Sequence, residues 1–126
     1  MSRSYVFNTF IQNNVNLTFG SDWDVTPLNP LEGIYAAVSR KTLDGSNPDG
    51  WYPEQKISIF EAIKCYTKNN AYAGFQEHRR GFIFPGFDAD LTILSKIAPV
   101  FPFLIESGFS IVKVILLIIL IFSLQK

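Results

Sequence analysis

The sequence predicts an α/β fold built from consecutive helix and strand units. Three features indicate it: apolar residues at helical spacing near the N-terminus, a following stretch of alternating apolar and polar residues, and a second helical segment with a clear N-terminal cap. The order helix, tight turn, strand is typical of repeating βα folds. In such folds ligands bind just beyond the C-terminal ends of the strands.

The first helix is indicated by apolar residues at positions 6, 7, 10 and 11, and the Asn13-Asn14 pair suits the turn that ends it. Residues 15–19 then alternate apolar and polar side chains and stop at Gly20, which predicts a strand. The residues that follow this predicted strand are Ser21, Asp22 and Trp23. The βα pattern therefore makes this short segment the candidate ligand-binding position.

A second helix is predicted from Pro30 to about Ser39, with Asn29 as its cap and Glu32 in its first turn. Residues 40–56 are polar and rich in turn-forming residues, so we expect an irregular loop there. Loops of this length in compact domains are usually lids, binding loops or linkers. A third helix is expected to begin with a capping box at residues 58–61 and to continue toward residue 73.

Two short strands around a Pro85-Gly86 turn are predicted for residues 81–94. The remainder, residues 97–126, is strongly apolar, and the segment 105–124 carries the charges Glu106 and Lys113. Three interpretations of this tail stay open: a strand or core segment, a helix inserted in a membrane, and an artefact of translation. The two charges count against insertion, because a membrane span needs about 20 apolar residues.

Composition excludes some classes of function. The chain has 11 Lys and Arg residues and 11 Asp and Glu residues, so it has no net field that would hold a nucleic-acid backbone. We therefore expect no nucleic-acid partner. The single cysteine, Cys65, has no partner for an intrachain disulfide, which is typical of a reducing compartment. A cytoplasmic location is expected, with membrane association as the alternative if the tail inserts.

Several motifs occur in an order that resembles the amidohydrolase superfamily, and most closely its branch called amidohydrolase family 3. The resemblance covers about residues 14–95. It depends on Gly20-Ser21-Asp22-Trp23, on Pro27-Leu28-Asn29-Pro30-Leu31 and on Ala36-Ala37-Val38 with Arg40-Lys41. It continues with Ser58, Glu61-Ala62, Tyr66-Thr67 and Asn70-Ala71, and with Gly81, Pro85-Gly86 and Ala89-Asp90-Leu91.

The resemblance implies the last strand-helix unit of a (β/α)8 metal-dependent hydrolase barrel, together with part of an adjoining small β-sandwich. The implied boundaries are residues 1–76 for the barrel portion, 77–96 for the strands that return to the sandwich, and 97–126 for the tail. The implied activity is hydrolysis of non-peptide C–N bonds in small amide-type substrates. A divalent metal, usually zinc, is the implied cofactor in the intact family.

Asp22 matches the family aspartate that binds the metal and takes a proton from the attacking water. The alternative role for Asp22 is that of a turn residue whose carboxylate caps local amides. The family site also needs a His-x-His pair and further ligands, whereas this chain has one histidine, His78, which we expect on the surface. We expect Cys65 to be an inert helix thiol, and Asp90 to fix a turn.

The sequence therefore predicts a C-terminal amidohydrolase fragment that binds no metal and is inactive as an isolated chain. A second hypothesis is a small, non-enzymatic membrane-associated protein anchored by residues 105–124. A third is an interaction module that associates with itself or with another protein through apolar surface.

Overall fold

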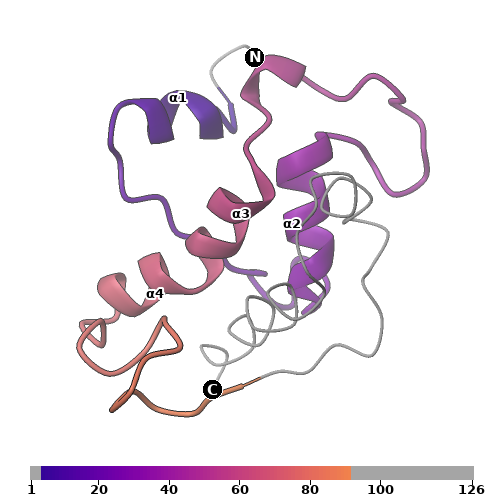
Figure 1. The fold of residues 1–126 in the computed structure, drawn as a ribbon. Helices are drawn as coiled ribbons and strands as arrows, with labels where there is room; N and C mark the ends of the chain where they lie inside the picture. Colours follow the sequence, from indigo (N-terminus) through magenta and orange to yellow (C-terminus); the bar gives the residue numbers. More distant parts are fainter. Residues whose placement is uncertain (1–3, 92–126) are drawn as a thin grey trace, which may run out of the picture. The chain divides into compact units, whose positions relative to one another are not determined.

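The computed structural model describes residues 4–91. Within this range the chain forms four α-helices and one short 3₁₀ helix (Figure 1). The chain divides into two compact units, Met1–Cys65 and Tyr66–Lys126. The first unit contains α1, α2 and all of α3 except its last residue, and the second contains α4.

Helix α1, Phe7–Gln12, confirms the first predicted helix. It lies against the 3₁₀ helix η1, Pro53–Gln55, within the first unit. The backbone N–H of Thr9 donates to Oε1 of Gln55 at 3.1 Å, and Nδ2 of Asn8 donates to the carbonyl oxygen of Glu54, also at 3.1 Å. These bonds connect positions 46 residues apart, so they fix the N-terminal helix to the end of the 40–56 loop.

The strand predicted for residues 15–19 is wrong for this structure, because no β-strand forms within residues 4–91. The backbone N–H of Val15 donates to Phe10, that of Leu17 donates to Val15, and that of Phe19 donates to Cys65. A strand is defined by a ladder with a neighbouring strand. The alternating pattern is present, but the described part of the chain supplies no strand to pair with it.

Helix α2, Pro30–Ser39, confirms the second predicted helix and its cap. The side-chain oxygen of Asn29 accepts a hydrogen bond from the backbone N–H of Leu31 at 3.1 Å, which satisfies one of the amides left open at the helix start. The buried face of α2 carries Ile34, which is 0% exposed, and Ala37. This face belongs to the apolar core of the first unit: Pro30, Ile34, Ala37, Ile57, Ile59, Ala62, Ile63 and Cys65.

The third predicted helix begins as expected, but it is interrupted. Oγ of Ser58 accepts a hydrogen bond from the backbone N–H of Glu61 at 3.2 Å, at the start of α3, Ile59–Tyr66. At Thr67 the backbone leaves the helical region, with φ −120° and ψ −88°, and α4, Lys68–Ala73, follows. Thr67 is β-branched and has a low helix propensity, so the apolar periodicity alone did not reveal the break.

The Pro-Gly turn predicted in residues 81–94 is confirmed, and the strands beside it are not found within residues 81–91. The backbone N–H of Phe87 donates to the carbonyl oxygen of Phe84 at 3.0 Å across Pro85 and Gly86. Gly86 has φ +92°, which suits the third position of a type II turn. The rest of the prediction, residues 92–94, lies outside the described residues.

The interpretations of the apolar tail, residues 97–126, also lie outside the described residues. Among the helices of residues 4–91, none combines the length and the apolar character needed to cross a membrane. The domain boundaries at residues 76 and 96 stay predictions.

Candidate functional site

Asp22 begins a closed turn in the first unit. Its backbone has φ +53°, in the left-handed region that aspartate tolerates better than most residues. The backbone N–H of Val25 donates to the carbonyl oxygen of Asp22 at 2.7 Å, and Oγ1 of Thr26 donates to the carbonyl oxygen of Ser21. The two bonds hold residues 21–26 in one loop, and this loop fixes where the Asp22 side chain starts.

The Asp22 side chain is exposed, as are the apolar side chains beside it. Trp23 is 66% exposed and Val25 is 76% exposed. Within residues 4–91 the Asp22 carboxylate makes no hydrogen bond or ion pair, so it does not cap a local amide. Asp44 shows the contrast, because its carboxylate accepts a hydrogen bond from the backbone N–H of Ser46 at 3.0 Å. Within the described residues, the carboxylate of Asp22 therefore accepts no hydrogen bond, whereas that of Asp44 accepts one from a nearby backbone amide.

The other residues considered from sequence do not gather around Asp22. His78 is exposed and belongs to the second unit, as its polar surroundings predicted. Cys65 lies inside α3, which confirms its predicted place in a helix, and its side chain is fully buried, with 0% exposure. Within residues 4–91 there is no group of three or more His, Cys, Asp or Glu side chains arranged to hold a metal ion.

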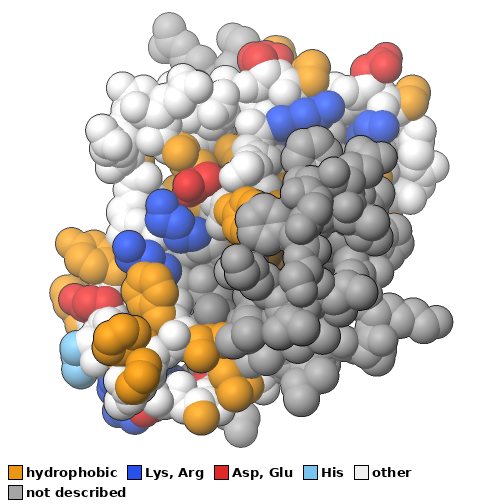
Figure 2. Space-filling view, in the orientation of Figure 1, with side chains coloured by type: hydrophobic (Ala, Val, Ile, Leu, Met, Phe, Trp, Pro, Cys, Tyr) orange, Lys and Arg blue, Asp and Glu red, His pale blue; other side chains and the backbone are white. Residues whose placement is uncertain are grey.

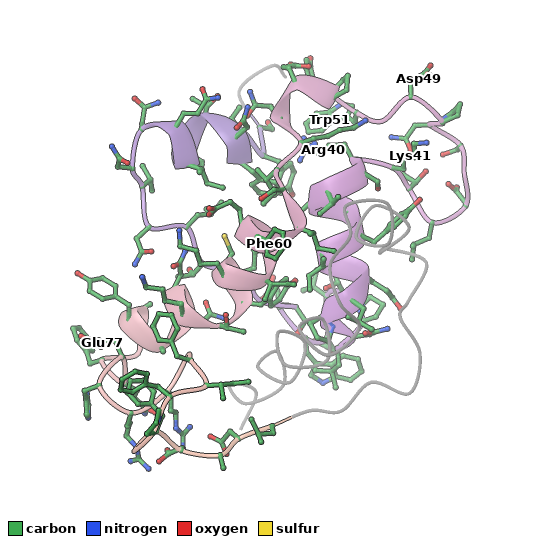
Figure 3. All side chains as sticks on the ribbon, viewed as in Figure 1. Arg40, Lys41, Asp49, Trp51, Phe60 and Glu77 are labelled. Carbon is green, nitrogen blue, oxygen red and sulfur yellow. The ribbon has the colours of Figure 1, made fainter. Side chains whose placement is uncertain are left out.

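Arg40 forms a second polar centre in the first unit, and no sequence pattern indicated its burial. It follows α2 with φ +60°, and its backbone N–H caps the helix by donating to the carbonyl oxygen of Ala36 at 2.9 Å. Its own carbonyl oxygen accepts from the backbone N–H of Trp51 at 2.7 Å, while its Nε donates to the carbonyl oxygen of Trp51 at 3.0 Å. Arg40 and Trp51 lie side by side at the end of α2 (Figure 3).

The Arg40 guanidinium is enclosed by aromatic rings. Its Cζ atom lies 5.1 Å from the ring centroid of Phe7 and 5.1 Å from that of Trp51, within the range of cation–π attraction. The residue is 7% exposed, and its Nη2 atom has no hydrogen-bond partner in the described part of the chain. Burial lowers the pKa of Arg40, and the negative charge of Glu54 opposes that shift. An unsatisfied buried donor costs about 1–3 kcal/mol, and more when it is charged.

The 40–56 loop is closed on itself by side-chain hydrogen bonds. Oδ1 of Asn47 accepts from the backbone N–H of Thr42 at 2.6 Å and from its hydroxyl at 2.8 Å, and Nδ2 of Asn47 donates to the carbonyl oxygen of Arg40 at 3.2 Å. Hydrogen bonds from the Thr42 side chain and from Ser46 lower the pKa of Asp44 to about 2. The loop predicted to be irregular contains the 3₁₀ helix η1 near its end, and side-chain hydrogen bonds connect residues in its earlier part.

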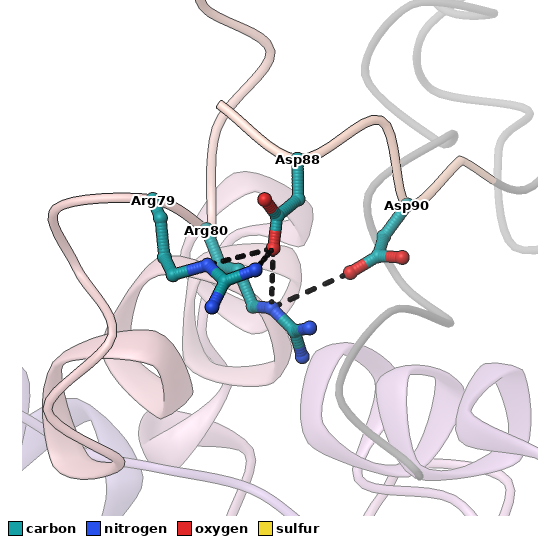
Figure 4. Close-up of polar contacts among 4 residues, drawn as sticks. All are labelled: Arg79, Arg80, Asp88 and Asp90. Carbon is teal, nitrogen blue, oxygen red and sulfur yellow. Dashed lines mark hydrogen bonds and ion pairs between the residues drawn. The ribbon is translucent and has the colours of Figure 1, made fainter. Parts of the chain in front are cut away.

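In the second unit, two arginines converge on one carboxylate (Figure 4). Oδ2 of Asp88 lies 2.7 Å from Nη2 of Arg79 and 3.0 Å from Nε of Arg80. Hydrogen bonds from Arg80 and Arg79 lower the pKa of Asp88. Asp90 joins the group at 3.5 Å from Nε of Arg80. The two positive and two negative charges balance, so the cluster fixes the turn after α4 and leaves no net charge for an ion.

Comparison with known proteins identifies the family. A family model described as "Amidohydrolase family" matches residues 1–103. The chain belongs to the amidohydrolase family. Members of the amidohydrolase family are generally metal-dependent hydrolases with a TIM-barrel-type fold. The resemblance found in the motifs is therefore confirmed at the level of the family.

Individual relatives support the same assignment. The chain is 36% identical over 95 residues to the amidohydrolase YtcJ of Bacillus subtilis, a match that covers 75% of the chain and 18% of that protein. It is 37% identical over 95 residues to the protein LONG AFTER FAR-RED 3 of Arabidopsis thaliana, covering 75% and 16%. It is 29% identical over 82 residues to the N-substituted formamide deformylase of Arthrobacter pascens, covering 65% and 15%.

The chain spans less than a fifth of the length of these relatives. No solved structure matches it significantly. Zinc sites in catalytic domains use about three protein ligands and an open position. Asp22 offers one carboxylate, and residues 4–91 bring no further ligands to it, so the described residues do not fit a complete metal site of the kind found in the amidohydrolase family.

Proposed function

We propose that this chain supplies the C-terminal, Asp22-bearing portion of a metal-dependent amidohydrolase that hydrolyses non-peptide C–N bonds in small amide-type substrates. Zinc is the proposed metal. In this proposal Asp22 is one ligand of the site and accepts a proton from the attacking water. The other ligands come from polypeptide outside residues 4–91, and the isolated chain is inactive without it.

The proposal depends on the exposure of the Asp22 carboxylate and on its lack of local hydrogen bonds. It is exposed on a turn closed by two hydrogen bonds, and it has no partner within the described range. A carboxylate that served only to stabilise the turn would accept a local amide, as that of Asp44 does. An open carboxylate at a fixed position is what a shared metal site requires of each contributing segment.

The substrate class is proposed from one relative. The similarity to the formamide deformylase of Arthrobacter pascens supports a formamide-type C–N bond as the first class to assay. Trp23 and Val25 flank Asp22 with exposed apolar surface, which favours a substrate that carries an apolar group on nitrogen.

The apolar surface supports a polypeptide partner. Apolar side chains are visible on the face of the molecule shown in Figure 2. In the second unit Phe75 is 83% exposed and Phe84 is 65% exposed. Large exposed apolar groups favour association with further polypeptide, either the remainder of an amidohydrolase or a second copy of this chain.

The proposal is tested by exchanging segments. The matched 82-residue segment of the Arthrobacter pascens deformylase is replaced by the corresponding segment of this chain. Hydrolysis of an N-substituted formamide and the zinc content of the purified chimera are then measured. Asp22→Asn is expected to lower activity by at least about 10²-fold, since it removes a ligand and a proton acceptor.

Asp24→Asn is the matched control, because Asp24 is exposed in the same turn, two residues away. We expect it to leave zinc content and activity near those of the parent chimera. Retention of both zinc and activity by Asp22→Asn would show that Asp22 is a turn residue. The isolated full chain should show neither stoichiometric zinc nor turnover, and zinc bound to it at one equivalent would overturn the claim that its ligands are incomplete.

A further inference from the structure

The guanidinium of Arg40 has a charged N–H group that donates no hydrogen bond within the described residues. Its Nη2 atom is buried and makes no hydrogen bond within residues 4–91. The residue as a whole is 7% exposed. Buried polar groups in folded proteins nearly always have a partner, and a buried charge needs one more than a neutral group does. The missing acceptor therefore indicates a ligand or a contact that the described residues do not supply.

Contacts with neighbouring residues fix the orientation of the Arg40 guanidinium. Its Nε donates to the carbonyl oxygen of Trp51, and its Cζ atom lies 5.1 Å from the ring centroid of Phe7 and 5.1 Å from that of Trp51. The backbone of Arg40 is tied to Trp51 as well. Any rotation of the guanidinium would break the Nε bond and both ring contacts, so the acceptor has to come to Arg40.

The chemistry of the missing acceptor follows from its surroundings. A guanidinium N–H group binds carboxylate oxygens strongly, and the bond strengthens where aromatic rings exclude water. Nη2 itself has almost no solvent-accessible surface, so a carboxylate reaches it only when neighbouring side chains move aside. Glu54 is the carboxylate whose charge acts on Arg40, but no hydrogen bond or ion pair joins the two side chains in the described structure.

We propose that Nη2 of Arg40 is a binding site for a single carboxylate, supplied either by a small free acid or by an aspartate or glutamate side chain of another polypeptide. The site belongs to the first unit and involves neither Asp22 nor a metal. It lies at the end of α2, where Arg40 contacts Trp51 and Phe7.

The first experiment uses the full chain, labelled with ¹⁵N at arginine, and sodium formate as the probe. Sodium chloride at matched ionic strength is the control. We expect formate to shift the side-chain signals of Arg40 in a saturable way and to leave those of Arg79 and Arg80 unchanged, because both already donate to Asp88. Shifts shared by Arg40, Arg79 and Arg80, or produced equally by chloride, would contradict the proposal.

Two variants sharpen the result. Arg40→Lys keeps the positive charge but removes the planar donor group, and we expect the formate affinity to fall at least about tenfold. Glu54→Gln removes the competing negative charge, so the affinity should rise roughly two- to fivefold. If Arg40→Lys fails to fold, the comparison of Arg40 with Arg79 and Arg80 in the unchanged chain decides the outcome. Equal formate affinity in a folded Arg40→Lys variant would overturn the proposal.

A second arm separates the two sources of the carboxylate. The probe is a short peptide with blocked ends and one glutamate, and its control is the same peptide with glutamine. Saturable binding of the glutamate peptide at Arg40 assigns the site to a polypeptide partner. Binding of formate without binding of the peptide assigns it to a small acid. Failure of both probes to bind at Arg40 would mean that Nη2 takes no external carboxylate, and the proposal would be wrong.

Discussion

Gly50, in the 40–56 loop, has no room for a side chain. An ideal Cβ atom built on Gly50 would lie 2.7 Å from the carbonyl oxygen of Ser39 and 3.3 Å from Cβ of Arg40. Its φ is +85°. The close approach lets the backbone N–H of Trp51 reach the carbonyl oxygen of Arg40 at 2.7 Å. Gly50→Ala is therefore expected to weaken the whole connection between the loop and α2.

Gly45→Ala is the matched control, because Gly45 lies in the same loop with φ +74°, and a Cβ atom added there would meet nothing within 4 Å. Both substitutions place alanine at positive φ, which costs about 1 kcal/mol or more. Gly50→Ala adds a contact with a helix-end carbonyl that cannot move freely, which costs about 1–3 kcal/mol more. We expect the free energy of unfolding to fall by about 1 kcal/mol for Gly45→Ala and by about 3 kcal/mol for Gly50→Ala.

Urea denaturation followed by tryptophan fluorescence measures this difference. Both tryptophans, Trp23 and Trp51, belong to the first unit, so their emission follows the unit that contains the two substitutions. A unit of this size has a total stability of only about 3–10 kcal/mol, so a difference of about 2 kcal/mol is large. Equal losses in the two variants would refute the reasoning, because positive φ alone would then explain both.

Two other predictions test local features of the structure. Asn29→Ala should destabilise the first unit by about 1 kcal/mol through loss of the α2 cap, while Asn29→Ser should cost only a few tenths, as the same fluorescence assay can check. Asp88 has a lowered pKa, so its stabilising contribution is complete above its ordinary unfolded pKa of about 4 and is lost as the pH falls through the lower folded value. The protection of the α4 amides against hydrogen exchange, corrected for the intrinsic exchange rate at each pH, should therefore fall in that acidic window for the parent chain. Asp88→Asn should abolish this fall. An unchanged protection profile in the variant would argue against the contacts with Arg79 and Arg80.

The parts of the fold that sequence predicted well depend on residues close together in the chain. The α2 cap joins Asn29 to a backbone amide two residues later, and the α3 cap joins Ser58 to one three residues later. The Pro85-Gly86 turn is equally local. Each of these features can be inferred from a few adjacent residues, because the geometry of a cap or a turn is set by the side chains within it.

The features that the sequence predicted wrongly or did not reveal depend on residues far apart in the chain. Alternation at residues 15–19 indicated which side chains share a face, but a ladder needs a second strand, and the described residues have none. Thr67 divides a helix whose apolar spacing looked continuous. Arg40 was missed for the same reason, since charged residues are seldom buried. Its burial results from Phe7 and Trp51, and Phe7 lies 33 positions away.

Asp22 could be predicted only in part from the sequence. The motif order identified it as the candidate residue, and the structure shows an exposed carboxylate on a closed turn. No local pattern could show that this carboxylate would be free of local amides while that of Asp44 would not, because both aspartates occur in turn-rich sequence. Hydrogen-bond geometry distinguishes them, and that geometry is set by how each turn folds.

The buried thiol of Cys65 offers a chemical measure of the stability of the first unit. Because this side chain is 0% exposed and is the chain's sole cysteine, a thiol reagent can react only when the packing around α3 opens. The alkylation rate in water, without denaturant, then reports how often that opening occurs. Each substitution in α2 or in the loop can thus be ranked by a single chemical rate on unlabelled protein.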